Sequence, residues 1–203
     1  MKKNLFRVLS LAMAFLCLST AHAQDTKAVS IIPQPQKLEA KGGEYLLPEK
    51  VVIGYDASFK AQAEYLQELL ARSTGRVAVL KEGKTKGSIV LQMDTVAVPV
   101  AEAYTLSVTP KCARIVASDA NGAFYGIQSL LQLFPAEIYS ASWQRSTEWK
   151  APCVEIYDAP ERPWRGLMMD VARYFYDKEF IKKTIDMMGM YKLNKLQFHL
   201  IDD

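Results

Sequence analysis

The sequence predicts an α+β amino-terminal domain, in which two helices pack on a sheet, followed by a parallel β-α-β unit. Three observations lead to this fold class. Apolar residues recur at helical spacing over residues 58–72 and 121–134. Short stretches rich in β-branched and apolar residues surround both predicted helices. From residue 167 onward the pattern changes to a strand, a helix and a second strand.

The first predicted helix covers residues 58–72. Its apolar residues repeat at helical spacing, Ser58 is a suitable amino-terminal cap, and Gly75 follows its end. Before it, the two prolines in residues 31–36 favour an extended backbone, because proline disfavours helix at the residue it follows. Strands are expected around this helix at Val51–Tyr55, Val77–Leu80 and Ser88–Met93.

The second predicted helix covers residues 121–134. Its apolar residues fall on one face, either Asp119 or Asn121 can cap it, and Pro135 ends it. Around this helix we expect a hairpin of residues 104–108 and 114–118, a surface loop over residues 136–150 and a short strand over residues 153–157.

A proline-bounded segment, residues 158–163, marks a predicted domain boundary. We therefore assign residues 24–157 to the α+β domain and residues 158–203 to the start of a second domain. The β-α-β unit of this second domain consists of a strand at 167–171, a helix that Asp177 caps and that runs to about Tyr191, and a strand at 193–200. A helical crossover predicts that the two strands are parallel.

The first 23 residues have the pattern of a secretory signal peptide. The pattern consists of a basic start, a short apolar stretch and a small-x-small cleavage site: Lys2, Lys3 and Arg7, then Val8–Leu18, then Ala21-His22-Ala23. We expect removal of residues 1–23 and a periplasmic or extracellular location. Cys17 raises the alternative of a lipoprotein, which is disfavoured because Leu16 is larger than the residue that usually precedes a lipidated cysteine.

Composition excludes several classes of protein. A chain that is 50% hydrophobic and 23% charged does not have the composition of a disordered protein. The 25 basic residues exceed the 22 acidic residues only because residues 1–23 contain three basic residues and no acidic one. The predicted mature chain is therefore neutral, which argues against nucleic-acid binding. Beyond the amino terminus no apolar run reaches the length of a transmembrane helix, about 18 residues or more.

Cysteine and histidine are scarce after the predicted cleavage site. Cys112 and Cys153 either form a disulfide in an oxidising compartment or remain unpaired as small buried side chains. Their spacing matches no metal-binding motif, and His199 is the single histidine. The sequence therefore predicts neither a zinc site nor a Cys–His dyad.

Polar side chains follow both strands of the predicted β-α-β unit. Asp170 and Arg173 leave the first strand, and His199, Asp202 and Asp203 end the second. Because the carboxyl ends of neighbouring parallel strands meet, these residues are expected to lie close together, where α/β folds bind ligands. The guanidinium of Arg173 suits sugar hydroxyls or a carboxylate.

The same residues also fit a structural role. Arg173 and an aspartate could form a structural ion pair at the barrel rim, and a lone histidine such as His199 is often structural. Asp202 and Asp203 are not expected to form a general acid and nucleophile pair, because adjacent strand residues point to opposite faces.

The motifs around these residues resemble a known enzyme family. Residues 164–175, 187–195 and 197–203, with the pattern R-G-L-x-x-D-x-x-R followed by H-L-x-D-D, resemble the start of the catalytic barrel of family 20 glycoside hydrolases, the β-N-acetylhexosaminidases. Upstream, residues 32–35 and 120–133 are similar to the small amino-terminal domain of that family. The resemblance implies a (β/α)8 TIM barrel for the second domain.

The resemblance also implies an activity and site roles. Members of the family remove terminal non-reducing N-acetylhexosamine (GlcNAc or GalNAc) from glycans and chitooligosaccharides, with retention and without a cofactor; the 2-acetamido group of the sugar is the nucleophile. By position, Arg173 resembles the arginine that holds the outer hydroxyls of the sugar, and Asp202 resembles the aspartate that supports a downstream histidine. Less specific positions that shape the floor of the pocket are Arg165, Asp170, His199 and Asp203.

A complete barrel needs roughly 250 residues, and only 43 follow Pro160. We therefore expect these 203 residues to be a fragment that lacks the downstream Asp-Glu pair with the general acid and to be inactive alone, whereas the full-length protein is an enzyme. Two alternatives are a relative that releases a disaccharide or acts on another amino-sugar linkage, and a secreted, non-catalytic carbohydrate-binding or assembly module.

Overall fold

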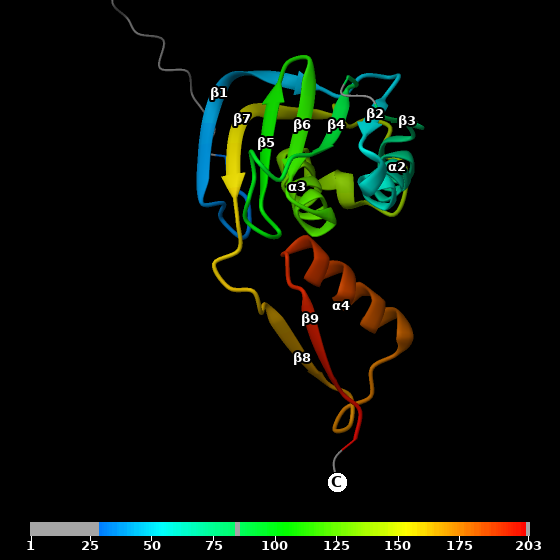
Figure 1. Cartoon of the computed structure of the whole chain (residues 1–203). Helices are drawn as coiled ribbons and strands as arrows, with labels where there is room; N and C mark the ends of the chain where they lie inside the picture. Colours follow the sequence, from blue (N-terminus) through cyan, green and yellow to red (C-terminus); the bar gives the residue numbers. More distant parts are fainter. Residues whose placement is uncertain (1–28, 84–85, 202–203) are drawn as a thin grey trace, which may run out of the picture.

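The computed structural model describes residues 29–83 and 86–201. The predicted signal peptide, Asp202 and Asp203 lie outside this part. The described chain forms two bodies, an α/β body above and a smaller strand–helix–strand body below (Figure 1). This arrangement confirms the predicted fold class.

The larger body is built on one mixed, seven-stranded sheet with the strand order β1-β7-β5-β6-β4-β2-β3. The pairs β2–β3, β2–β4 and β4–β6 are parallel, whereas β5–β6, β5–β7 and β1–β7 are antiparallel. The predicted hairpin is confirmed as β5–β6. The strands are β1 (Lys37–Leu46), β2 (Val52–Tyr55), β3 (Val79–Glu82), β4 (Ile89–Met93), β5 (Tyr104–Thr109), β6 (Cys112–Ala117) and β7 (Lys150–Asp158).

Two helices, α2 (Lys60–Thr74) and α3 (Ala120–Leu133), pack against this sheet and close the core. At the start of α3, the Asp119 carboxylate accepts a hydrogen bond of 2.8 Å from the Gly122 amide, so Asp119 is the cap. The short 3-10 helices η1 (Ala57–Phe59) and η2 (Ala136–Tyr139) flank the two helices. Leu66, Leu70, Ile127 and Leu130 on the helices are fully buried.

Two local predictions were wrong, and one strand was not predicted. Ser58 does not cap α2, which follows η1 directly and has no side-chain cap. The segment predicted as a surface loop, residues 136–150, contains η2 and buries Ile138 and Trp149 in the core. Strand β1 was not predicted because most of its residues are exposed and therefore lack an apolar alternation. Cys112 and Cys153 are free thiols.

The smaller body is the predicted β-α-β unit. It consists of β8 (Gly166–Asp170), α4 (Lys178–Met190) and β9 (Lys195–His199). The two strands are parallel, as predicted. Asp177 caps α4 as predicted, since its carboxylate accepts a hydrogen bond of 2.8 Å from the Phe180 amide.

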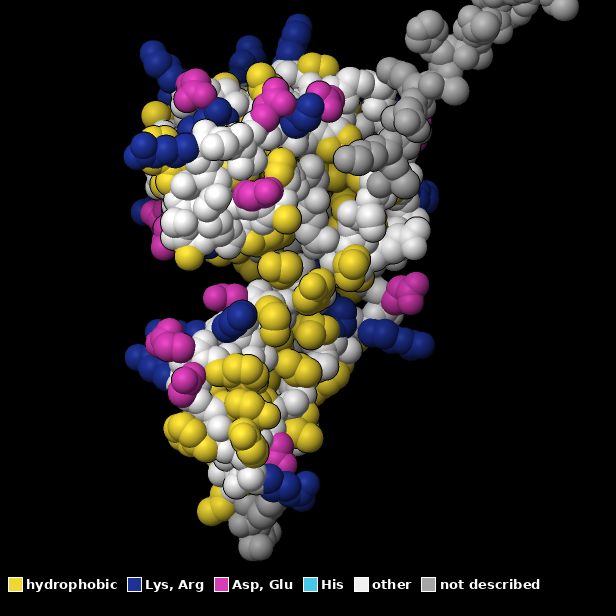
Figure 2. All heavy atoms as spheres, turned by 180° about the vertical axis from the view of Figure 1, so that it is seen from behind, with side chains coloured by type: hydrophobic (Ala, Val, Ile, Leu, Met, Phe, Trp, Pro, Cys, Tyr) yellow, Lys and Arg dark blue, Asp and Glu magenta, His cyan; other side chains and the backbone are white. Residues whose placement is uncertain are grey.

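Many apolar side chains of this unit are exposed. Figure 2 shows them gathered over the lower, narrower body of the molecule. They are Leu167 and Met168 of β8, Phe180, Ile185 and Met187 of α4, and Phe198 of β9. An apolar surface of this kind is typical of a face that packs against further structure. Within the described residues, no helix is both long and apolar enough to cross a membrane.

Candidate functional site

The site is formed where β8 and β9 end. The register pairs Gly166 with Lys195 at the amino ends and Asp170 with His199 at the carboxyl ends. The amide of Val171 donates a hydrogen bond of 3.0 Å to the carbonyl oxygen of His199, which extends the pairing by one residue. The structure thus brings Asp170 and His199 together, as the parallel arrangement predicted.

Asp170 holds the turn that leads to Arg173. Its Oδ1 accepts hydrogen bonds from the amides of Ala172 and Arg173, at 3.1 and 3.0 Å. Its Oδ2 lies 3.6 Å from Nη1 of Arg173. The hydrogen bond from the Arg173 amide, together with the positive charge of the Arg173 guanidinium, lowers the pKa of Asp170 below its ordinary value. Asp170 is therefore ionised at neutral pH, and its negative charge lies beside the guanidinium of Arg173.

The side chain of Arg173 is 76% exposed, so its guanidinium can reach a ligand while one nitrogen stays near Asp170. A guanidinium that a carboxylate orients can donate to two adjacent hydroxyl groups of a sugar.

Aromatic side chains follow Arg173 in the loop that leads to α4. The rings of Tyr174 and Tyr176 lie 5.5 Å apart, and Tyr176 stacks on Phe180 at 4.6 Å. Tyr174 and Phe175 are exposed. Exposed aromatic rings beside hydrogen-bond donors suit a ligand with one apolar and one polar face. The sequence interpretation did not assign a role to these rings, although an aromatic run directly after a strand end is visible in the sequence.

Arg165 lies at the opposite end of β8 from Asp170, and the structure does not bring it to this site. Its guanidinium contacts Glu102 at 2.7 Å and the Tyr125 hydroxyl at 3.0 Å, both on the larger body. This placement favours a role at the junction of the two bodies over one in the pocket floor. The assignments of Asp202 and Asp203 stay predictions, because both residues lie outside the described part of the chain.

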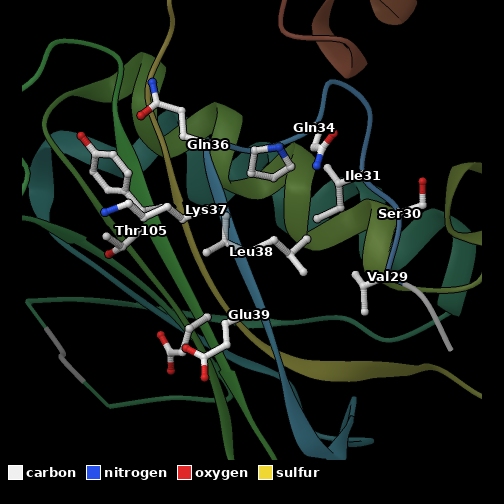
Figure 3. A pocket seen from close by; sticks show the side chains of 13 residues that line it. Val29, Ser30, Ile31, Gln34, Gln36, Lys37, Leu38, Glu39 and Thr105 are labelled. Atoms are coloured by element: carbon white, nitrogen blue, oxygen red, sulfur yellow. The ribbon is translucent and has the colours of Figure 1, made fainter. Parts of the chain in front are cut away.

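A hollow of about 960 Å³ lies on the larger body and is shown in Figure 3. Its charged side chains already have partners. Glu155 accepts a hydrogen bond from Ser107, Glu39 pairs with Lys41, and Lys37 lies over the ring of Tyr157. Because the hollow is open and its charges are paired, the strand ends of β8 and β9 are the better candidate site. No group of three or more His, Cys, Asp or Glu residues suited to a metal ion occurs within residues 29–83 and 86–201.

Comparison with known proteins places both bodies in one family. The family model described as glycosyl hydrolase family 20, domain 2, matches residues 28–159, and the model of the family 20 catalytic domain matches residues 163–203.

Similar proteins carry related names. A β-hexosaminidase of Porphyromonas gingivalis is 35% identical over 180 residues, which cover 87% of this chain and 23% of that protein. An N,N'-diacetylchitobiase of Vibrio harveyi is 31% identical and matches 87% of this chain and 19% of its own length. The solved structure of an N-acetyl-β-hexosaminidase of Streptomyces plicatus, 32% identical, superposes with a TM-score of 0.76 over 84% of this chain and 34% of that one. The chain spans about a fifth of the length of these curated relatives.

Proposed function

The chain belongs to glycosyl hydrolase family 20, and on this basis we propose that the protein carrying it is a β-N-acetylhexosaminidase. Its substrates are glycans or chitooligosaccharides that end in a non-reducing GlcNAc or GalNAc. The names of the relatives, β-hexosaminidases and a chitobiase, support this reading. The observation that carries the proposal is the Asp170–Arg173 turn beside His199, at the carboxyl ends of two parallel strands, where barrel enzymes bind their substrates.

In the proposed reaction Arg173 binds the terminal sugar. Its guanidinium, oriented by Asp170, donates hydrogen bonds to two outer hydroxyls of the ring. The oxygen of the sugar's own acetamido group attacks the anomeric carbon, and water then opens the resulting ring with overall retention, a known exception to the two-carboxylate scheme. The general acid that protonates the leaving oxygen is supplied by a segment outside the described residues.

The test is hydrolysis of 4-nitrophenyl N-acetyl-β-glucosaminide and of the matching galactosaminide by the intact protein. We expect release of nitrophenol from at least one of them, and release of single N-acetylhexosamine units from a chitooligosaccharide. Disaccharide release would identify a different exo-acting relative. Binding of the oligosaccharide without hydrolysis would support a non-catalytic module and contradict the proposal.

We also propose that the protein is exported and loses residues 1–23, because a basic start, a short apolar stretch and Ala21-His22-Ala23 precede Gln24. The intact mass of the protein recovered from the periplasm or the medium tests this. A mature chain that begins at Gln24 is the expected result, and retention of Met1 would contradict it.

A further inference from the structure

Two basic side chains of the β-α-β unit contact the larger body at the junction between the two bodies. They are Arg165, directly before β8, and Lys192, two residues after the end of α4. Both line a hollow of about 670 Å³ that opens between the two bodies. They lie at the end of the strand pair that is opposite to Asp170 and His199.

Lys192 is buried in a polar cluster of the larger body, with 5% of its surface exposed. Its Nζ donates hydrogen bonds of 2.8 Å to the hydroxyl of Tyr104 and to Oδ2 of Asp158. The Tyr104 hydroxyl also lies 2.6 Å from that of Ser129 on α3. Burial lowers the pKa of Lys192, and the charge of Asp158 opposes this shift. Separating Lys192 from Asp158 would leave a buried charge uncompensated, which is costly. The pair therefore holds the segment after α4 in place against the larger body.

The guanidinium of Arg165 connects three segments. Nη2 donates to Glu102 Oε2 at 2.7 Å and to the Tyr125 hydroxyl at 3.0 Å, both on the larger body. Nε donates to the carbonyl oxygen of Lys192 at 2.8 Å, and Nη1 donates to that of Arg162 at 2.8 Å. The planar fork therefore holds the start of β8, the loop before β9 and the larger body in one arrangement.

The main chain of Arg165 fixes the register of the strand pair. Its amide donates to Oδ1 of Asn194 at 3.0 Å, and its carbonyl oxygen accepts from the amide of Asn194 at 2.9 Å. A shift of β8 against β9 by one residue would break these bonds and would separate Asp170 from His199 at the other end.

Backbone strain is concentrated at the same junction. Within residues 29–83 and 86–201, the two non-glycine residues with a positive φ are Glu102 (62°) and Lys192 (61°). A left-handed backbone is unfavourable for residues with a Cβ and persists where surrounding contacts hold it. Here the side chains of both residues are held by ion pairs across the junction, Glu102 to Arg165 and Lys192 to Asp158.

We propose that Arg165 and Lys192 are positioning residues whose side chains hold the amino ends of β8 and β9 against the larger body, where the bonds between Arg165 and Asn194 set the register, and thereby hold Asp170 and Arg173 beside His199 at the carboxyl ends. The expected effect on catalysis rests on the proposed glycosidase function. The expected effect on the arrangement of β8 and β9 does not depend on that function.

The first arm of the test is kinetic and uses the intact protein. Arg165→Lys keeps the charge but cannot reproduce the fork, and the matched control is Arg162→Lys, an exposed position three residues upstream. Well below the melting temperature of each variant, we expect kcat of Arg165→Lys to fall about tenfold or more, because small displacements in an active site cost large factors in rate. The control should stay within about twofold of the wild type.

The second arm separates positioning from simple stability. Lys192→Met leaves the largely buried carboxylate of Asp158 without its cation and should lower Tm, whereas Lys192→Met combined with Asp158→Asn removes the uncompensated charge and should recover Tm. If the cluster only stabilises the protein, kcat recovers with Tm. If it positions the strands, kcat of the double variant stays about tenfold reduced.

The third arm is hydrogen exchange and needs no activity. The amide of Val171, bonded to His199 at the far end of the strands, should exchange about tenfold faster in Arg165→Lys, while amides of the β5–β6 hairpin keep their protection. Unchanged exchange at Val171, or recovery of kcat with Tm in the double variant, would overturn the proposal. If the wild type hydrolyses no N-acetylhexosaminide, the proposed function fails, and exchange at Val171 still decides the role of Arg165.

Discussion

Asp170 and His199 are directly paired across β8 and β9, and this pairing places the carboxylate that organises the Arg173 turn beside an imidazole. The two residues are 29 positions apart in the sequence, and only the parallel register makes them neighbours.

The Asp170 carboxylate is expected to matter through its charge as well as its shape. In Asp170→Asn the amide oxygen can still accept from Ala172 and Arg173, but the negative charge beside the guanidinium is lost. We expect kcat/KM of the intact protein to fall about tenfold, because a misoriented Arg173 loses bonds made in the transition state. Steady-state kinetics beside thermal melting measures this. A fall in Tm with unchanged kcat/KM would assign Asp170 a purely structural role.

Arg173→Lys tests the sugar-binding role of the guanidinium. A lysine keeps the charge but cannot donate to two adjacent hydroxyls, so about 1.5–3 kcal/mol of binding is expected to be lost. If those contacts tighten as the ring distorts, kcat falls with affinity. The matched control is Lys182→Arg, an exposed position on α4 whose partner is Glu179. Unchanged kcat/KM in Arg173→Lys would remove Arg173 from the site.

Alkaline pH is expected to destabilise the larger body. Burial is the main cause that raises the pKa values of four tyrosines above the ordinary 10.0: Tyr45, Tyr104, Tyr125 and Tyr139. The unfolded chain therefore releases these protons first, so their contribution to stability is complete below pH 10.0 and is lost as the pH rises above it. The lowered pKa of Lys192 acts in the opposite direction on stability, but it is one group against four tyrosines. Tm measured against pH should be flat near neutrality and fall above pH 10.

Two tyrosine variants give this prediction a matched comparison. Within the described residues the buried hydroxyl of Tyr139 has no hydrogen-bond partner, whereas that of Tyr104 contacts Ser129, Asp158 and Lys192. Tyr139→Phe should therefore cost little at neutral pH and reduce the alkaline loss. Tyr104→Phe should cost about 1–3 kcal/mol at neutral pH, because Ser129, Asp158 and Lys192 each lose a hydrogen bond in a buried cluster. Equal effects of the two variants would contradict this account.

The polypeptide of residues 24–203 is expected to hydrolyse no N-acetylglucosaminide and to self-associate. Strands β8 and β9 form a two-stranded sheet with open edges, and apolar side chains such as Leu167, Phe180 and Ile185 are exposed. Residues 24–157, which contain the helices and all of the seven-stranded sheet except Asp158 at the end of β7, should remain monomeric. Size-exclusion chromatography with light scattering compares the two polypeptides. A monomeric and active 24–203 polypeptide would show that the site needs no further segment.

Elements with a strong apolar period were predictable from the sequence, and elements held by distant partners were not. Helix α3 has a continuous buried face and a capping aspartate, so its limits were found to within one residue. Strand β1 was not predicted, because its residues are mostly exposed and its partner β7 lies more than 100 residues away in the sequence. No local pattern reveals such a pairing.

The candidate site was also only partly predictable. The proximity of Asp170 and His199 could be predicted, because both end parallel strands of predictable length. The contacts of Arg165 could not be predicted, because its partners Glu102 and Tyr125 are 63 and 40 residues distant in the sequence. A motif position gives the identity of a residue, and the end of the strand on which it lies decides what it contacts.

The most direct test of the central claim compares two substrates that differ only at carbon 2 of the sugar. The intact protein is assayed with 4-nitrophenyl N-acetyl-β-glucosaminide and with 4-nitrophenyl β-glucoside, which carries a hydroxyl in place of the acetamido nucleophile. If the sugar supplies its own nucleophile, kcat/KM for the glucoside should be lower by about 1,000-fold or more, since the covalent step is lost. Comparable kcat/KM values for the two substrates would contradict the proposed substrate-assisted β-N-acetylhexosaminidase.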